Sequence, residues 1–195
     1  MYTVMSLLDI FLETLSGLIS LYISFFSVKA YKLTRDRILK YLQLSFLLIG
    51  LATILRVGLN IMSYISRYFE VALSIFNLIY ILSTLVAYFS LSYIYSGREL
   101  ERTLTSILLI FVGYHSLAIF LLSYIVLNIA LWVGKEAKIA IAGYSLIAFS
   151  HLLSLFTPYW RGLAILENFP RLIGFILLLL LVVRAERIGK NVQQI

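Results

Sequence analysis

The chain has no cysteine and only two prolines and two histidines among its 195 residues. Without cysteine it can form no disulfide, no thiolate metal site and no cysteine nucleophile. It also lacks the H-E-x-x-H, G-x-S-x-G and P-loop patterns of familiar enzymes, and no aspartate cluster has metal-ligand spacing. These absences argue against an enzyme, above all a metal-dependent one. Glutamine is also scarce, as in proteins of thermophilic organisms.

Charged residues are few as well, at 13 % of the chain, whereas hydrophobic residues reach 62 % and the mean hydropathy is +1.00. A soluble domain has roughly 25 % charged residues and must place many side chains in water. A bilayer removes that demand. The first 17 residues lack a basic segment and contain Asp9 and Glu13, so we expect them to stay in place as part of a first span. The sequence therefore predicts an integral membrane protein.

Apolar stretches of about 20 residues are long enough to cross a bilayer as helices. The predicted fold is one all-α domain, residues 1–195, an antiparallel bundle of about six transmembrane helices joined by short loops. The predicted spans are 4–28, 38–65, 69–95, 103–133, 137–156 and 169–188.

The segment before the last span has two interpretations. Thr157 and Pro158 resemble a helix N-cap followed by proline at the first helical position. The favoured prediction is a short interfacial helix over 158–168 that ends before Pro170, which would leave Glu167 and Arg171 near lipid headgroups. The alternative is one long, kinked helix that continues through Pro170.

The net charge is +7, and the basic residues lie in short loops beside apolar spans. This distribution indicates orientation in a lipid bilayer rather than binding to nucleic acid. The counts of Lys and Arg favour a cytoplasmic Lys29–Lys40 loop with both termini outside, although the basic C-terminus argues the other way. A seventh span or a re-entrant segment near Trp160–Pro170 would reconcile the two. The Lys29–Lys40 cluster could also attract anionic headgroups or a membrane or cytoplasmic protein partner.

Polar residues recur at three- and four-residue steps along the first three spans. Residues at this spacing lie above one another on a helix, and small or hydroxyl side chains mark contacts between membrane helices. The stripes predict either dry packing between helices or a polar path. Their members are Asp9, Glu13, Ser16, Gly17, Ser20, Ser24 and Ser27; Gln43, Gly50, Thr53, Arg56, Asn60, Ser63 and Arg67; and Ser74, Asn77, Thr84, Tyr88 and Tyr95.

Glu13 and Arg56 lie at similar depths of the first two spans if those helices are antiparallel. An ionisable group in hydrocarbon costs about 2.5–3.5 kcal/mol or more, so such groups rarely lack a partner. We therefore predict a buried Glu13–Arg56 pair supported by Asn60. The pair could fix the helix register or take part in binding or proton movement. Asp9, Asn60, Asn77 and Tyr88 complete the candidate intramembrane site.

His115 and His151 are candidate ligands for a haem b iron, because two imidazoles on facing helices can hold one haem. Their depths agree, but their helix faces agree less well. His151 shares a face with small residues such as Ala140 and Gly143, which suits packing against another helix.

Three functions follow from these features. The first is a non-enzymatic membrane subunit, anchor or small-ligand-binding module. The second is a haem b subunit that carries electrons through His115 and His151. The third is a small transporter or channel with a path near Glu13 and Arg56.

Overall fold

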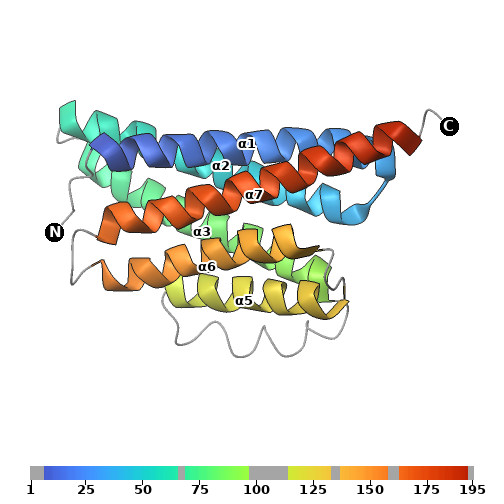
Figure 1. Ribbon diagram of the computed structural model, residues 1–195. Helices are drawn as coiled ribbons and strands as arrows, with labels where there is room; N and C mark the ends of the chain where they lie inside the picture. Colours follow the sequence, from blue (N-terminus) through green and yellow to red (C-terminus); the bar gives the residue numbers. More distant parts are fainter. Residues whose placement is uncertain (1–6, 66–68, 97–113, 133–136, 158–162, 193–195) are drawn as a thin grey trace.

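The computed structural model describes residues 7–65, 69–96, 114–132, 137–157 and 163–192. Within these ranges the chain is helical apart from short connections, which confirms the predicted all-α bundle (Figure 1). The six helices are α1 Leu7–Thr34, α2 Arg37–Ile65, α3 Phe69–Ser96, α5 Tyr114–Trp132, α6 Lys138–Phe156 and α7 Leu163–Val192.

All of these helices except α5 are long and apolar enough to cross a membrane; within α5 the apolar stretch is the shorter Ala118–Leu131. Large apolar side chains such as Leu55, Leu82 and Leu180 point outward and are about half exposed. In water this surface would be unfavourable, whereas lipid accepts it. The bundle therefore has the exterior of a membrane protein.

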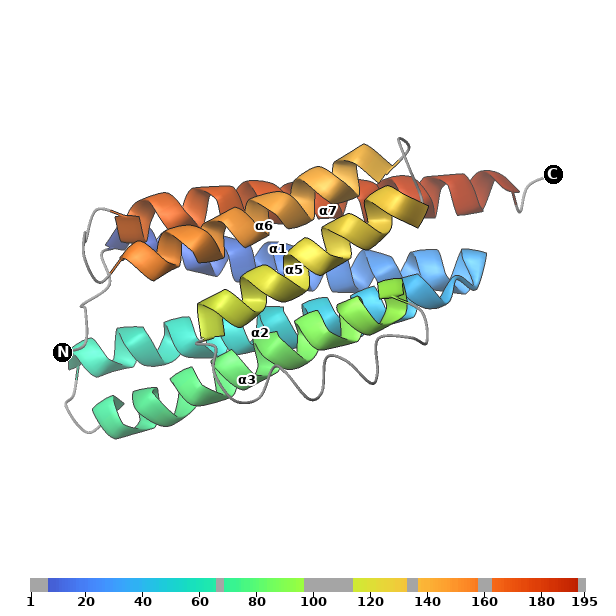
Figure 2. The same cartoon turned by 90° about the horizontal axis from the view of Figure 1, so that it is seen from below.

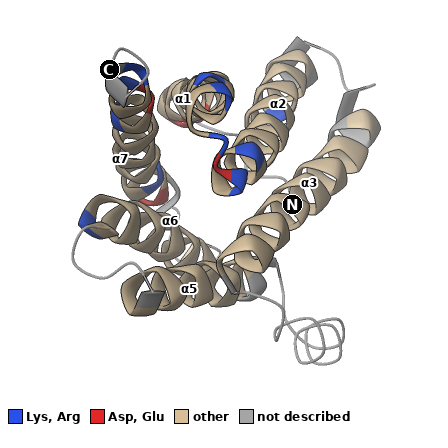
Figure 3. Cartoon of the chain, turned by 90° about the vertical axis from the view of Figure 1, so that its right-hand side faces the viewer, with Lys and Arg blue, Asp and Glu red and all other residues tan. Residues whose placement is uncertain are grey.

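The main helix contacts form a closed ring in the order α1, α2, α3, α5, α6, α7 and back to α1 (Figures 2 and 3). Side chains from helices that are not neighbours in the ring meet in its interior. Phe46 of α2 and Phe175 of α7 pack edge to face, with ring centroids 5.7 Å apart. Tyr88 of α3 meets His151 of α6 in the same way. The core is thus a packed interior and not an open pore.

Neighbouring helices joined by short connections are antiparallel, but two contacts in the ring are parallel. Asp9 meets Asn168 near the start of α1 and α7, and Leu33 lies beside Gly189 near their ends. Along α3 and α5, the Ser92 hydroxyl donates to the Leu121 carbonyl, and Figure 2 shows both helices running the same way. Consequently α3 ends and α5 begins at opposite ends of the bundle.

This arrangement corrects the expectation that the two termini share a side. The start of α1 and the end of α7 lie at opposite ends, and the basic end of α7 lies beside the Lys29–Lys40 connection (Figure 3). Residues 103–113 of the predicted fourth span lie outside the described residues. Relative to α1, helices α5, α6 and α7 each run in the direction opposite to the one that the predicted order of spans gives.

The helix that contains Pro170 also differs from the favoured prediction. Helix α7 continues through Pro170 as one element, so no separate helix ends before it; residues 158–162 lie outside the described residues. Proline removes one backbone donor, but membrane helices tolerate it when neighbouring groups compensate. The alternative interpretation, one long helix, is the correct one from Leu163 onward.

Glycines allow two pairs of helices to approach closely. A Cβ added at Gly174 of α7 would lie 2.7 Å from the carbonyl oxygen of Gly143 on α6. A Cβ added at Gly50 of α2 would lie 3.1 Å from the carbonyl oxygen of Gly17 on α1. Small residues at such crossings let backbones touch, which is a main source of helix association in lipid.

We expect Gly174→Ala to destabilise the bundle by about 1–3 kcal/mol, because the new methyl group overpacks the α6–α7 crossing. Gly58→Ala is the matched control, since nothing lies within 4 Å of a Cβ at that position. Alanine in an open helical position should raise stability by about 0.5–1 kcal/mol. Thermal unfolding of both variants in detergent measures the difference; equal stability would contradict the close crossing.

Candidate functional site

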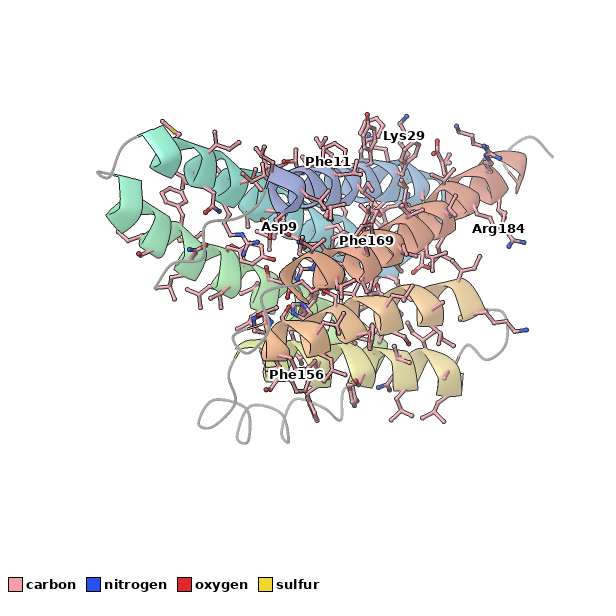
Figure 4. The ribbon with its side chains drawn as sticks, turned by 60° about the vertical axis from the view of Figure 1, so that its left-hand side comes forward. Asp9, Phe11, Lys29, Phe156, Phe169 and Arg184 are labelled. Carbon is pink, nitrogen blue, oxygen red and sulfur yellow. The ribbon has the colours of Figure 1, made fainter. Side chains whose placement is uncertain are left out.

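Five Asp, Glu and Arg residues of the helices gather in one half of the bundle, at the end opposite the Lys29–Lys40 connection. Asp9 and Glu13 come from α1, Arg56 from α2, and Glu167 and Arg171 from α7. We call this part of the bundle the charged half, and the end with Lys29–Lys40 the basic end. Figure 4 shows Asp9 and Phe169 toward the first and Lys29 and Arg184 toward the second.

Glu13 and Arg56 form an ion pair, which confirms the pair predicted from helix depth. The Glu13 side chain is 3 % exposed and that of Arg56 19 %. The Arg56 guanidinium also lies 4.1 Å from the centre of the Tyr80 ring, a cation–π contact. Asn60 donates its amide to the main-chain carbonyl of Arg56, so this contact supports the helix turn rather than the guanidinium.

Arg171 is buried inside the bundle, whereas the favoured prediction left it near lipid headgroups. Its Nε donates to the Ser150 hydroxyl at 3.1 Å, and one terminal nitrogen lies 3.9 Å from a Glu167 oxygen. One residue before Pro170, Phe169 points outward, whereas Asn168 is buried and donates to Asp9 at 3.4 Å. The interior satisfies Arg171, so it does not need the membrane surface.

A small cavity lies between α1, α2, α3 and α7 in the charged half. Its volume is about 10 Å³, close to what one water molecule needs. Its polar walls come from Glu13, Ser16, Thr53, Tyr80, Thr84, Tyr88 and Arg171.

Two polar atoms on the cavity wall have no hydrogen-bond partner among the described residues, Oε2 of Glu13 and the Ser16 hydroxyl. Both residues are 2 % exposed. A buried polar atom without a partner costs about 1–3 kcal/mol, so such atoms usually meet an ordered water or a ligand. The cavity is therefore suited to a polar species of about the size of water.

The two histidines are in direct contact, although their faces appeared poorly matched in sequence. Nδ1 of His115 lies 3.3 Å from Nδ1 of His151, and Nε2 of His151 lies 3.0 Å from the Tyr88 hydroxyl. His151 and Ser150 belong to the buried face of α6, as the small residues beside them predicted. The agreement in depth is thus correct and the doubt about the faces was wrong.

This contact does not fit a haem held by both histidines. Such a haem places its iron between the two coordinating nitrogens and its flat macrocycle between the rings. Here the facing nitrogens are 3.3 Å apart, and the other nitrogen of His151 is bonded to Tyr88. In the described part of the chain, no group of three His, Asp or Glu side chains could hold a metal ion.

The predicted stripes have different outcomes on the three helices. All seven stripe residues of α1 are buried inside the bundle, from Asp9 to Ser27. On α3, Thr84 and Tyr88 reach the cavity, whereas Asn77 is half-buried and does not line it. Sequence reasoning missed Tyr80, Ser150, Asn168 and Arg171 as members of the site. For Asn168 and Arg171, the face of α7 continued through Pro170 would have been the signal.

Comparison of the chain with family models, curated proteins and solved structures gave no match. The function is therefore argued from the site itself.

We expect Glu13→Gln to destabilise the protein by about 3–5 kcal/mol, because it leaves the Arg56 charge without its carboxylate inside the bundle. Adding Arg56→Gln should recover a large part of that loss, since no charge then remains unpaired. Lys40→Gln is the control, because Lys40 is exposed at the basic end, and a surface substitution usually changes stability by less than about 0.5 kcal/mol. Unfolding in detergent is measured for these three variants and for the single Arg56→Gln variant, and strictly additive losses at Glu13 and Arg56 would refute the coupling.

Proposed function

We propose that this chain is a non-enzymatic, multi-pass membrane protein that binds a small polar species in the cavity of its charged half. The observation that carries the proposal is the cavity lined by Glu13 and the buried Arg171, because Oε2 of Glu13 has no hydrogen-bond partner among the described residues. Ionisable groups inside a membrane are costly, and they commonly mark substrate, ion or proton sites. The bundle would then act as a small-ligand-binding module.

The size of the cavity limits which ligands it can bind. Organic ligands occupy pockets of about 300–1,000 Å³, whereas this cavity holds about one water molecule. A water molecule, a small ion or a proton carried on water suits that volume. The lining includes one carboxylate, hydroxyl groups and the Arg171 guanidinium, so it offers both donors and acceptors.

The other half of the interior argues against a continuous path through the membrane. Its buried residues are mainly apolar, including Ile23, Leu42 and Val182. The Ser27 hydroxyl donates to the Ile23 carbonyl and the Ser45 hydroxyl to the Ala87 carbonyl, so both are already bonded. The site therefore supports binding from one side rather than a channel.

The distribution of cations supports an orientation with the basic end in the cytoplasm. Lys and Arg near the ends of membrane helices favour the cytoplasmic side. Arg56 and Arg171 lie in the charged half, and the other described cations gather at the basic end (Figure 3). They are Lys29, Lys32, Arg35, Arg37, Lys40, Lys138, Arg184, Arg187 and Lys190. In this orientation the cavity lies in the outer half of the bundle.

The basic end also suits a contact with anionic headgroups or an acidic partner. The end of α7 adds Arg187 and Lys190 to the Lys29–Lys40 cluster, because Gly189 packs against Leu33 and Thr34. A cation near an anionic bilayer surface contributes about 1 kcal/mol of attraction. A partner that binds the Lys29–Lys40 loop would therefore also meet Arg187 and Lys190 at the end of α7.

The absence of native cysteine makes orientation directly measurable, because each introduced cysteine is the only thiol. We expect Leu7→Cys, at the start of α1, to react with an impermeant maleimide on intact cells. Lys32→Cys, at the end of the same helix, should react only after the cells are permeabilised. The reverse pattern would overturn the orientation.

Access to the cavity can be tested with silver ions, which are small and bind thiols. Added outside right-side-out vesicles, silver should protect Ser16→Cys from later alkylation under denaturing conditions. Ser27→Cys is the matched control, since Ser27 lies on the same buried stripe of α1 but in the apolar half. Equal protection of both thiols would contradict a cavity that opens to one side, and protection of neither would refute external access.

A further inference from the structure

A chain of proton-carrying side chains leads from α5 to the cavity. His115 is half-buried near the start of α5, and its Nδ1 lies 3.3 Å from Nδ1 of His151 on α6. The opposite nitrogen of His151 lies 3.0 Å from the Tyr88 hydroxyl on α3. Tyr88 lines the cavity together with Glu13. Three helices therefore contribute consecutive members of one hydrogen-bonded chain.

These side chains can each accept a proton on one atom and release another from a second atom. An imidazole has two such nitrogens, and a phenol oxygen is both donor and acceptor. Chains of this kind, with carboxylates and histidines, carry protons in membrane proteins. The far side of the cavity holds Oε2 of Glu13, which is buried and has no partner among the described residues. That oxygen is a suitable end point for a proton.

We propose that His115, His151 and Tyr88 form a proton relay that joins the start of α5 to the Glu13 carboxylate across the cavity. This inference rests on the proposed function, because it identifies the small polar species as a proton on water. It concerns uptake from the outer side and not conduction through the bundle.

The transfer conserves protons at each step. His115 takes up a proton on Nε2 and releases the one on Nδ1 to Nδ1 of His151. His151 then passes its Nε2 proton to the Tyr88 oxygen, and Tyr88 releases its own hydroxyl proton to water in the cavity. The water protonates Oε2 of Glu13. Both imidazoles end neutral with their N–H positions exchanged, and the carboxylate has gained one proton.

Charged and titratable groups surround this chain on the helices that pack against it. The Arg171 guanidinium is bonded to Ser150, the residue before His151. Arg56 is bonded to Glu13 and lies over the Tyr80 ring. The charged and titratable groups nearest the relay are Glu13 on α1, Arg56 on α2, Tyr80 on α3, Tyr144 on α6, and Arg171 with its partner Glu167 on α7.

Protonation of Glu13 has a structural consequence. A neutral carboxyl group no longer balances the Arg56 charge, so the ion pair that links α1 and α2 weakens. Arg56 keeps its contact with Tyr80. Through the relay, a lower external pH would thus weaken the contact between α1 and α2.

A pH-jump infrared measurement tests the relay on the full chain in lipid nanodiscs. Acidification should produce a protonated-carboxyl band that is absent in Glu13→Gln. In Tyr88→Phe the band should rise about 100-fold more slowly, since a positioned proton carrier contributes about 10²–10⁴-fold in rate. Tyr93→Phe is the matched control on the same helix, because Tyr93 is 45 % exposed; its rate should equal that of the wild type. An unchanged rate in Tyr88→Phe would overturn the relay.

Labelling with ¹⁵N-histidine gives a second readout, because the chain contains no histidine besides this pair. We expect the signals of His115 and His151 to change together as pH falls, and Tyr88→Phe to shift the His151 Nε2 signal selectively. Independent titration of the two rings would refute the shared hydrogen bond. If silver protects Ser16→Cys while the carboxyl band never appears, the cavity remains supported and the relay alone fails.

Discussion

The ion pair between Glu13 and Arg56 sets the geometry of the first half of the bundle. Neither charge can remain alone in hydrocarbon, so α1 and α2 must face each other at the depth where the two side chains meet. The glycines at positions 17 and 50 then bring the same two helices close together. The Arg56 guanidinium also packs against the Tyr80 ring of α3. One electrostatic requirement thus orients three helices around the cavity.

The same requirement explains why the charged half is at one end. Arg171 and Glu167 lie near the start of α7, which runs parallel to α1, so they reach the depth of Asp9 and Glu13. Each finds partners on another helix or one turn away. At the basic end, by contrast, cations reach the membrane surface and need no internal partner. The ring of helices therefore has an apolar, closed half and a polar half with a cavity.

Patterns within one helix were readable from sequence, whereas relations between distant helices were not. Periodicity identified the buried faces of α1 and α6, and antiparallel geometry across a short loop identified the Glu13–Arg56 pair. The direction of α7 relative to α1 was predicted wrongly, because short loops alone do not show that α3 and α5 run parallel. The proline at 170 favoured a helix end, although Asn168 and Arg171 were already spaced for a buried face.

The histidine pair is a second example of a relation between helices that could not be predicted from their separate sequences. Comparing faces on isolated helices ignores that α3 and α5 run parallel, which brings the start of α5 to Tyr88 and His151. Direct contact between the imidazoles suits proton exchange better than the binding of one haem iron by both rings.

The cavity is more than a packing defect. Most hydroxyl groups in the interior bond a carbonyl of their own helix or a neighbouring one, as those of Ser20, Ser45 and Thr84 do. Oε2 of Glu13 and the hydroxyls of Ser16 and Tyr144 have no hydrogen-bond partner among the described residues, and Glu13 and Ser16 line the cavity. An apolar pair of similar volume in place of Glu13 and Arg56 would often be neutral or stabilising. A bundle built only for stability would have no need of this arrangement, so the unsatisfied oxygen beside a hydrogen-bonded relay is better explained by what it binds.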